Sequence, residues 1–288
     1  MAWEKSNGFS QFLLWFIMVI IAITMLFPFV YVIAVSFSSF KDAVSNSLII
    51  IPLHPTIEAY AWVIRNGGVL QGLEISLFSS IVGTIISMLL TVTLAYALSR
   101  RDVPGIKFAV WIILLSLLIT PSIITKYLVV RQFGMIDTLW ALLIPSALNP
   151  FNVIVMRQFF LGIPGELVEC ARLEGANDWQ ILWRIMVPIS QAPLAAISLF
   201  YAVDIWNSFF EPTLYLNNQQ LYPVSVILRM IVLQGTNPIE AVTPGQTPPP
   251  DLTIQMAVVV LAMLPILLLY PFLQRYFTKG VLTGSIKG

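Results

Sequence analysis

Charged residues are scarce in this chain. Only 10% of its 288 residues are Asp, Glu, Lys or Arg, whereas soluble domains carry about 25%. So few charged side chains cannot cover the surface of a water-soluble protein of this size. Because 58% of the residues are hydrophobic, the sequence indicates a protein whose surface is largely surrounded by lipid.

Cysteine and histidine are almost absent. Cys170 is the single cysteine and His54 the single histidine, so the sequence excludes a disulfide framework and a Cys/His metal cluster. The net charge of +1 gives no electrostatic reason to expect nucleic-acid binding. A Gly-x-x-x-x-Gly-Lys-Ser/Thr phosphate loop is also missing from the sequence. We therefore expect no metal, no cofactor and no enzymatic activity in this chain.

Six segments are long and apolar enough to cross a membrane as helices. A spanning helix needs about 20 mostly apolar residues, whereas a strand of a membrane barrel has about 9–11 alternating residues. The first segment contains no charged residue between residues 6 and 40. This uncharged stretch is too long for the apolar region of a cleavable signal peptide. The predicted fold is an all-α membrane protein, a single domain over residues 1–288. Its six expected transmembrane helices are 11–37, 72–99, 106–126, 138–157, 184–207 and 252–274.

Lysine and arginine predict the orientation, because cytoplasmic loops carry the excess of both. Ten of these basic residues lie in the segments that six spans would place on one side of the membrane: Lys5, Arg100, Arg101, Lys107, Arg157, Arg172, Arg184, Arg275, Lys279 and Lys287. Five fall in the other set: Lys41, Arg65, Lys126, Arg131 and Arg229. We therefore expect both termini and the loop 158–183 in the cytoplasm. The long loop 208–251, whose stretch 224–233 is apolar enough for a short helix, is expected outside.

The predicted cytoplasmic loop 158–183 has the signals of a short helix followed by a sharp turn. Pro164 suits a first helical position, and Glu166 and Glu169 complement the positive end of the helix dipole. Gly175 suits the left-handed position just after the helix.

A second helix is expected after this turn. Asn177 can cap it and Gln180 can complete a capping box, and the helix is expected to continue into span five. A push on the loop would then tilt that span. Helical spacing predicts one small-residue face, suited to a groove on a soluble partner, formed by Leu167, Cys170, Ala171 and Glu174. The alternative is an ordinary amphipathic helix on the membrane surface.

At these residues the chain resembles the permease subunits of ABC importers, whose loop signature is Glu-Ala-Ala, three residues, then Gly. Glu169, Cys170 and Ala171 stand at its head and Gly175 closes it. Cys170 replaces an alanine and Glu174 replaces a common aspartate, and both changes preserve the size or charge. The resemblance extends over residues 10–288, most closely to the maltose-type second permease and its polysaccharide and oligosaccharide branch. It is carried further by the segments 95–100, 206–207, 214–216, 221–229 and 274–288.

The resemblance implies a type I ABC importer permease fold in the bacterial plasma membrane. It implies a homologous partner permease, two ATPase subunits that bind ATP and Mg, and an extracellular solute-binding protein facing the loop 208–251. The expected cargo is an oligosaccharide. The resemblance assigns coupling to the ATPase to Glu166, Glu169, Cys170, Ala171, Glu174 and Gly175, and a second contact in the tail to Lys279, Gly280 and Lys287.

The end of span five supplies candidates for the cargo pathway. Asp204 and Asn207 are polar, and Tyr201 and Trp206 are aromatic, the residue types that hold sugars. In the alternative interpretation Asp204 is solvated at the outer interface and the aromatic residues are interfacial anchors.

Two other functions remain open from the sequence. A secondary transporter driven by an ion gradient often has a charged site at mid-membrane, and here only Asp204 is a candidate. An ABC permease for a non-sugar solute is the other alternative. An intramembrane enzyme is disfavoured because no cluster of catalytic residue types is visible.

Overall fold

The computed structural model describes residues 8–39, 42–43, 49–65, 68–100, 102–119, 121–234 and 252–284. The regular elements among these residues are helices, and none of these residues belongs to a β-sheet. The chain divides into two compact units. One unit comprises Met1–Leu70 and Met230–Met263, and the other comprises Gln71–Arg229 and Leu264–Gly288.

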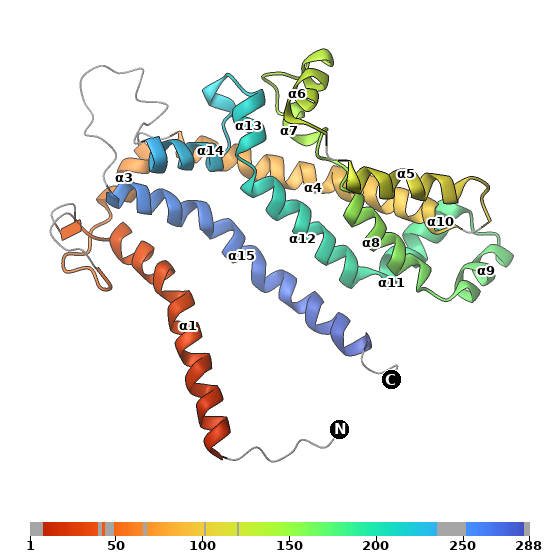
Figure 1. Ribbon diagram of the computed structural model, residues 1–288, viewed down its shortest axis with the longest axis horizontal. Helices are drawn as coiled ribbons and strands as arrows, with labels where there is room; N and C mark the ends of the chain where they lie inside the picture. The colour runs from red at the N-terminus through yellow and green to blue at the C-terminus, as the bar shows by residue number, and fades with distance from the viewer. Residues whose placement is uncertain are drawn as a thin grey trace. The chain divides into compact units, whose positions relative to one another are not determined.

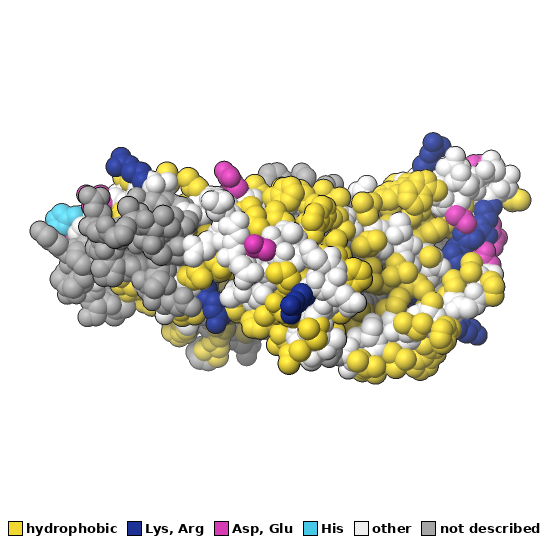
Figure 2. Space-filling model, turned by 90° about the horizontal axis from the view of Figure 1, so that it is seen from above, with side chains coloured by type: hydrophobic (Ala, Val, Ile, Leu, Met, Phe, Trp, Pro, Cys, Tyr) yellow, Lys and Arg dark blue, Asp and Glu magenta, His cyan; other side chains and the backbone are white. Residues whose placement is uncertain are grey.

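Within the described ranges, three helices are each long and apolar enough to cross a membrane. They lie in α1 (Gly8–Ser36), α4 (Val69–Ser99) and α15 (Leu252–Gly284). Three further pairs of helices meet the same criteria together but are bent, so the described residues contain up to six spans. Figure 2 shows hydrophobic side chains over much of one face of the molecule, as expected for a surface in lipid. The predicted all-α class is confirmed, while the side on which the termini lie stays a prediction.

The predicted third span is not one continuous helix. Instead, α5 (Ile106–Leu118) and α6 (Ile123–Gln132) meet at 119°. Pro121 has no N–H to donate to the carbonyl four residues earlier, which favours a break in the helix at this point. Ser122 then starts α6 by accepting a hydrogen bond from the backbone N–H of Thr125.

The predicted fourth span, 138–157, is wrong in its first half. Only the short α7 (Trp140–Leu143) is helical at the start, and the main helix α8 (Pro150–Leu161) begins where Asn149 caps it. Pro150 occupies the first helical position, where its missing N–H has no cost. α8 forms its bent pair, at 73°, with α9 (Gly165–Leu173).

The helix that follows Asn177 does not run straight into span five, contrary to the prediction. The segments 178–189 and 191–207 meet at 88°. Pro193 explains the break, because it cannot donate a hydrogen bond to the carbonyl of Ile189. Ser190 ends the first segment by donating its N–H to the carbonyls of Met186 and Val187. The helices here are α10 (Asp178–Ile181), the π-helix η1 (Leu182–Met186), α11 (Val187–Ile189) and α12 (Gln191–Asn207).

Lipid tails are as apolar as the side chains, so moving a side chain from lipid into the protein gives no hydrophobic driving force for helix packing. The helices of the second unit therefore associate through close packing and buried hydrogen bonds. One hydrophobic core joins α4, α8, α9, α10, η1 and α12 around Tyr96, Met156 and Phe160. The Tyr201 hydroxyl is 2.7 Å from Thr91 Oγ1 and accepts a hydrogen bond of 3.0 Å from the backbone N–H of Asn149. Tyr201 therefore connects α12 to α4 and to the start of α8.

A second cluster gathers the short helices that precede and follow these spans. Val130, Leu142 and Tyr215 pack together from α6, α7 and α13 (Phe210–Tyr215). Asp137, at a φ of 62°, accepts hydrogen bonds from the backbone N–H groups of Asn217 and Asn218. η2 (Gln219–Leu221) and α14 (Val224–Arg229) follow. Figure 1 shows α13 and α14 toward one end of α4, and α9 and α10 toward the other.

The first unit includes a set of contacts around the end of α1. The Ser36 hydroxyl lies 2.7 Å from the hydroxyl of Tyr60, in α3 (Glu58–Arg65). The rings of Phe37 and Tyr60 are 4.9 Å apart. Most side chains of α1 before this point are exposed, as expected for a span that faces lipid. The sequence predicts a short apolar helix at 224–233. The structure has one there, formed by α14 and, directly after it in the chain, the π-helix η3 (Met230–Gln234).

Candidate functional site

The turn after α9 has the conformation predicted for it. Gly175 has a φ of +86°. Its N–H donates to the carbonyl of Arg172, and the N–H of Ala176 donates to the carbonyl of Ala171. This pair of hydrogen bonds is a Schellman motif, which requires a left-handed residue after the helix. Glycine adopts that conformation without the steric cost that a Cβ introduces.

The start of α10 is also as predicted. Asn177 accepts a 2.8 Å hydrogen bond from the N–H of Gln180, and the Gln180 side chain accepts a 3.0 Å bond from the N–H of Asn177. This capping box satisfies two N–H groups that have no partner within the helix. The turn between α9 and α10 is therefore held from both sides by local hydrogen bonds.

The six residues predicted to couple to a partner fall into two groups. Ala171 is buried, in the core that contains Tyr96, Phe160 and Ile181. It packs against its own chain, so it is not available to a partner. The other five are exposed: Glu166, Glu169, Cys170, Glu174 and Gly175.

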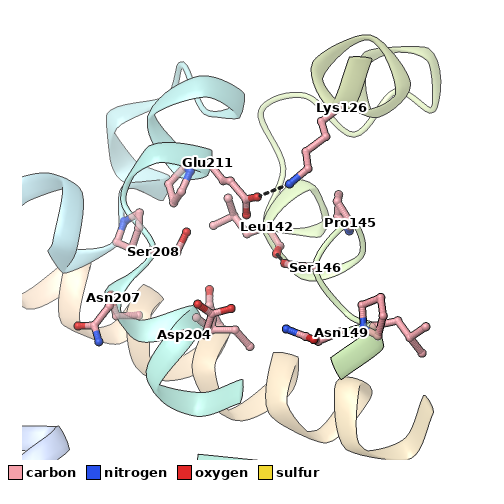
Figure 3. A pocket seen from close by; sticks show the side chains of 16 residues that line it. Lys126, Leu142, Pro145, Ser146, Asn149, Asp204, Asn207, Ser208 and Glu211 are labelled. Atoms are coloured by element: carbon pink, nitrogen blue, oxygen red, sulfur yellow. Dashed lines mark hydrogen bonds and ion pairs between the residues drawn. The ribbon is translucent and has the colours of Figure 1, made fainter. Parts of the chain in front are cut away.

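A polar cavity of about 440 Å³ lies between α4, α6, α12, α13 and the connection from α7 to α8. Figure 3 shows side chains from these elements converging on it. Lys126 Nζ lies 3.5 Å from Glu211 Oε1, which connects α6 with α13 across the cavity. The lining thus offers hydroxyl, amide, carboxylate and ammonium groups, which can hydrogen-bond a polyhydroxylated cargo. Its polar residues include Ser76, Lys126, Ser146, Asn149, Ser208 and Glu211.

The four predicted pathway residues are divided by the geometry of α12. Asp204 and Asn207, three residues apart and therefore on one face, both line the cavity and are exposed to it. Tyr201 is buried among the helices, where its hydroxyl makes the hydrogen bonds described above. Trp206 lines a separate, apolar groove with Leu77, on another side of α12.

The family follows from the comparison with known proteins. Residues 106–283 match the family described as "Binding-protein-dependent transport system inner membrane component". The chain belongs to this family. The predicted ABC importer permease is thereby confirmed, and the match includes α9, the Gly175 turn and most of the cavity lining.

Three similar proteins are informative about this inner membrane component. The polygalacturonan/rhamnogalacturonan transport system permease protein YtcP of Bacillus subtilis is 38% identical over 98% of this chain and 99% of its own length. Protein LplC of the same organism is 40% identical over 93% of this chain and 90% of its own. A bacterial ABC transporter involved in the import of the acidic polysaccharide alginate contains a chain with a TM-score of 0.87, at 26% identity, covering 96% and 99% of the two chains.

The inner membrane component exposes two large apolar side chains that the sequence analysis did not assign to the site. Leu173 is 89% exposed and Trp179 is 63% exposed, one on each side of Gly175. A signal for them was present, since Leu173 lies between Arg172 and Glu174 and Trp179 directly follows Asp178.

Most of the cavity lining was also missed from the sequence. The sequence predicts Lys126 at the outer end of span three and Ser146 within span four, and it gives no sign that both lie beside α12. The prolines at 121, 145 and 150 were the available signal that this region is broken. The packing of α6 and α7 against α13 decides where the helix breaks and how the resulting short helices are oriented.

The remaining predictions concern metal binding and the C-terminal tail. Among the described residues, no three metal-binding side chains of His, Cys, Asp or Glu lie close together. Lys279 and Gly280 belong to α15, but only their backbone is described, and Lys287 lies outside the described residues. A role of these three in contacting the ATPase stays a prediction.

Proposed function

We propose that this inner membrane component forms, with a homologous permease, the pathway of an ATP-driven importer for an oligosaccharide in the bacterial plasma membrane. ATP and Mg bind to separate ATPase subunits, and an extracellular binding protein delivers the cargo to the loop 208–251. The observation that carries the proposal is the polar cavity on α12, in a chain similar over nearly its full length to a permease of a polygalacturonan/rhamnogalacturonan transport system.

The exposed residues around Gly175 are the proposed contact with the ATPase. Glu166 and Glu169 present charge, and Leu173 and Trp179 present apolar area, on the two helices that the turn joins. A mixed surface of this kind fits a groove on a soluble partner. Ala171 contributes by packing α9 on the core that contains Tyr96, so a force on α9 reaches α4 and α8.

Uptake measurements test the energy source and the cargo. The complete complex is assembled in proteoliposomes with ATP inside, ion gradients are dissipated, and labelled neutral and uronate-containing oligosaccharides are offered with the binding protein. We expect ATP-dependent uptake of at least one oligosaccharide. Uptake that needs an ion gradient and no ATP would support the secondary transporter, and uptake of non-sugar solutes alone would reject the proposed cargo.

Asp204→Leu tests the cavity within this function. The loss of a hydrogen bond to a charged group costs about 1.5–3 kcal/mol, so we expect the KM for uptake to rise about tenfold or more. The matched control is Phe200→Leu, which changes an exposed residue of the same helix that does not line the cavity.

The readouts for this pair are uptake and ATP hydrolysis in the absence of cargo. We expect hydrolysis without cargo to remain near the wild-type rate in both variants. If Asp204→Leu transports with the wild-type KM, the cavity is not part of the pathway.

A further inference from the structure

Four charged side chains meet at the predicted cytoplasmic end of α4. The guanidinium of Arg100 donates two hydrogen bonds to the carboxylate of Asp102, of 3.0 and 2.8 Å, and a third to Asp178 Oδ1. Arg172 Nη2 lies 3.6 Å from Asp102 and 3.8 Å from Asp178. The four formal charges cancel, and we name these residues the charge quartet.

The charge quartet includes residues on both sides of the turn at Gly175. Arg172 stands in the last turn of α9, before the glycine, and Asp178 is the first residue of α10, after it. Arg100 and Asp102 come from the end of α4 and the connection to α5. The quartet therefore joins both sides of the turn to a membrane-spanning helix that lies 78 residues away in sequence from Asp178.

Arg100 is the enclosed member of the quartet. Its side chain is 15% exposed, whereas that of Asp178 is 62% exposed. Arg100 Nη1 also donates a 3.1 Å hydrogen bond to the hydroxyl of Tyr96, which is buried in the same core as Ala171 and Ile181. Arg100 thus connects the core of the second unit to the charged turn at its surface.

The geometry of these contacts requires arginine. A planar guanidinium can bind one carboxylate through two parallel N–H groups and still donate to others, whereas an ammonium group lacks this fork. The guanidinium of Arg100 also holds the pKa of the Asp102 carboxyl well below its usual range, mainly through these hydrogen bonds. Asp102 therefore stays ionised at neutral pH and keeps its ion pair with Arg100.

We infer that Arg100 is a positioning residue that transmits movement of the α9–α10 turn to α4, an inference that rests on the proposed function. Ala171 already packs α9 on the core that contains Tyr96, whereas α10 does not continue straight into α12 because of the 88° bend at Ser190. The charge quartet adds to this packing a connection between the turn and α4 through hydrogen bonds and ion pairs. A partner that displaces the turn then moves α4, whose residue Ser76 lines the polar cavity.

The test compares ATP hydrolysis with uptake in the assembled complex. In Arg100→Met we expect complex assembly and cargo-free hydrolysis close to wild type, with cargo transported per ATP reduced about five- to tenfold, within the usual range of coupling between sites. Arg100→Lys is expected to restore only part of this ratio because it lacks the fork. The matched control is Lys107→Gln, an exposed cation in the first turn of α5 outside the quartet.

Asp178→Asn keeps the test valid if Arg100→Met does not assemble, because Asp178 is largely exposed. We expect the same direction of change, and a double variant no worse than Arg100→Met alone, since both remove one connection. An unchanged ratio of uptake to hydrolysis in Arg100→Met or Asp178→Asn overturns the inference. If the wild-type complex shows no ATP-dependent uptake, the proposed function fails instead, and the two failures are thereby distinguished.

Discussion

Gly175→Val is expected to reduce cargo uptake by more than tenfold while the complex still assembles. The φ of Gly175 is +86°, and a β-branched residue is a severe outlier in that region. A Cβ at this position meets no atom within 4 Å, so the cost arises from the backbone conformation and not from a clash. To relieve it, the turn must open, which separates α9 from α10 and breaks the Schellman hydrogen bonds.

Gly175→Asn is the matched control, because asparagine is similar in size to valine but adopts the left-handed conformation far more readily. We expect its uptake to stay within about threefold of wild type. The measurement is uptake and ATP hydrolysis in proteoliposomes. If both variants lose uptake equally, any side chain at position 175 interferes with contact to a partner. If both variants keep the wild-type uptake, the conformation of the turn has no role in coupling.

Gly72→Ala is expected to lower the stability of the complex by about 1–3 kcal/mol, the usual cost of overpacking. A Cβ on Gly72 would lie 3.2 Å from the backbone N and Cα of Val224 and 2.5 Å from the Cδ1 of Ile227. The Ile227 side chain can move, but the backbone of α14 cannot move without losing the 2.9 Å hydrogen bond from Val224 N–H to Ser76 Oγ. The change should appear as a lower thermal unfolding midpoint in detergent.

Gly83→Ala is the internal control for this prediction. Gly83 lies in the same helix, and both changes gain about 1 kcal/mol of helix propensity. A Cβ on Gly83 would meet only the side-chain ends of Ile205 and Leu143, which can shift. We expect Gly83→Ala to be neutral or slightly stabilising, and a destabilisation equal to that of Gly72→Ala would contradict the argument from the backbone.

Local structure near α9 followed from short-range chemistry and could be predicted. The Gly175 conformation and the capping box of Asn177 and Gln180 each depend on residues within three or four positions. The beginning of α9 was predicted within one residue, since Pro164 is the residue before the helix and not its first. No distant part of the chain is needed to satisfy these hydrogen bonds.

The breaks at Pro121 and Pro193 were visible as prolines but not as bends of 119° and 88°. Prolines are tolerated within membrane helices when neighbours satisfy the freed backbone groups. Whether a helix kinks slightly or turns sharply therefore depends on its neighbours, such as Val130 and Tyr215, which pack α6 against α13. The extents predicted for spans three and four, 106–126 and 138–157, were wrong for this reason.

Composition and spacing by themselves determined that this chain is a helical membrane protein with a capped glycine turn in a charged loop, because lipid burial and helix capping act over short stretches. Only the tertiary structure decided that Asp204 faces a polar cavity while Tyr201 faces the core, and that Arg100 meets Asp178. These contacts join residues far apart in sequence. Their existence depends on the angles at which whole helices pack, which no local pattern specifies.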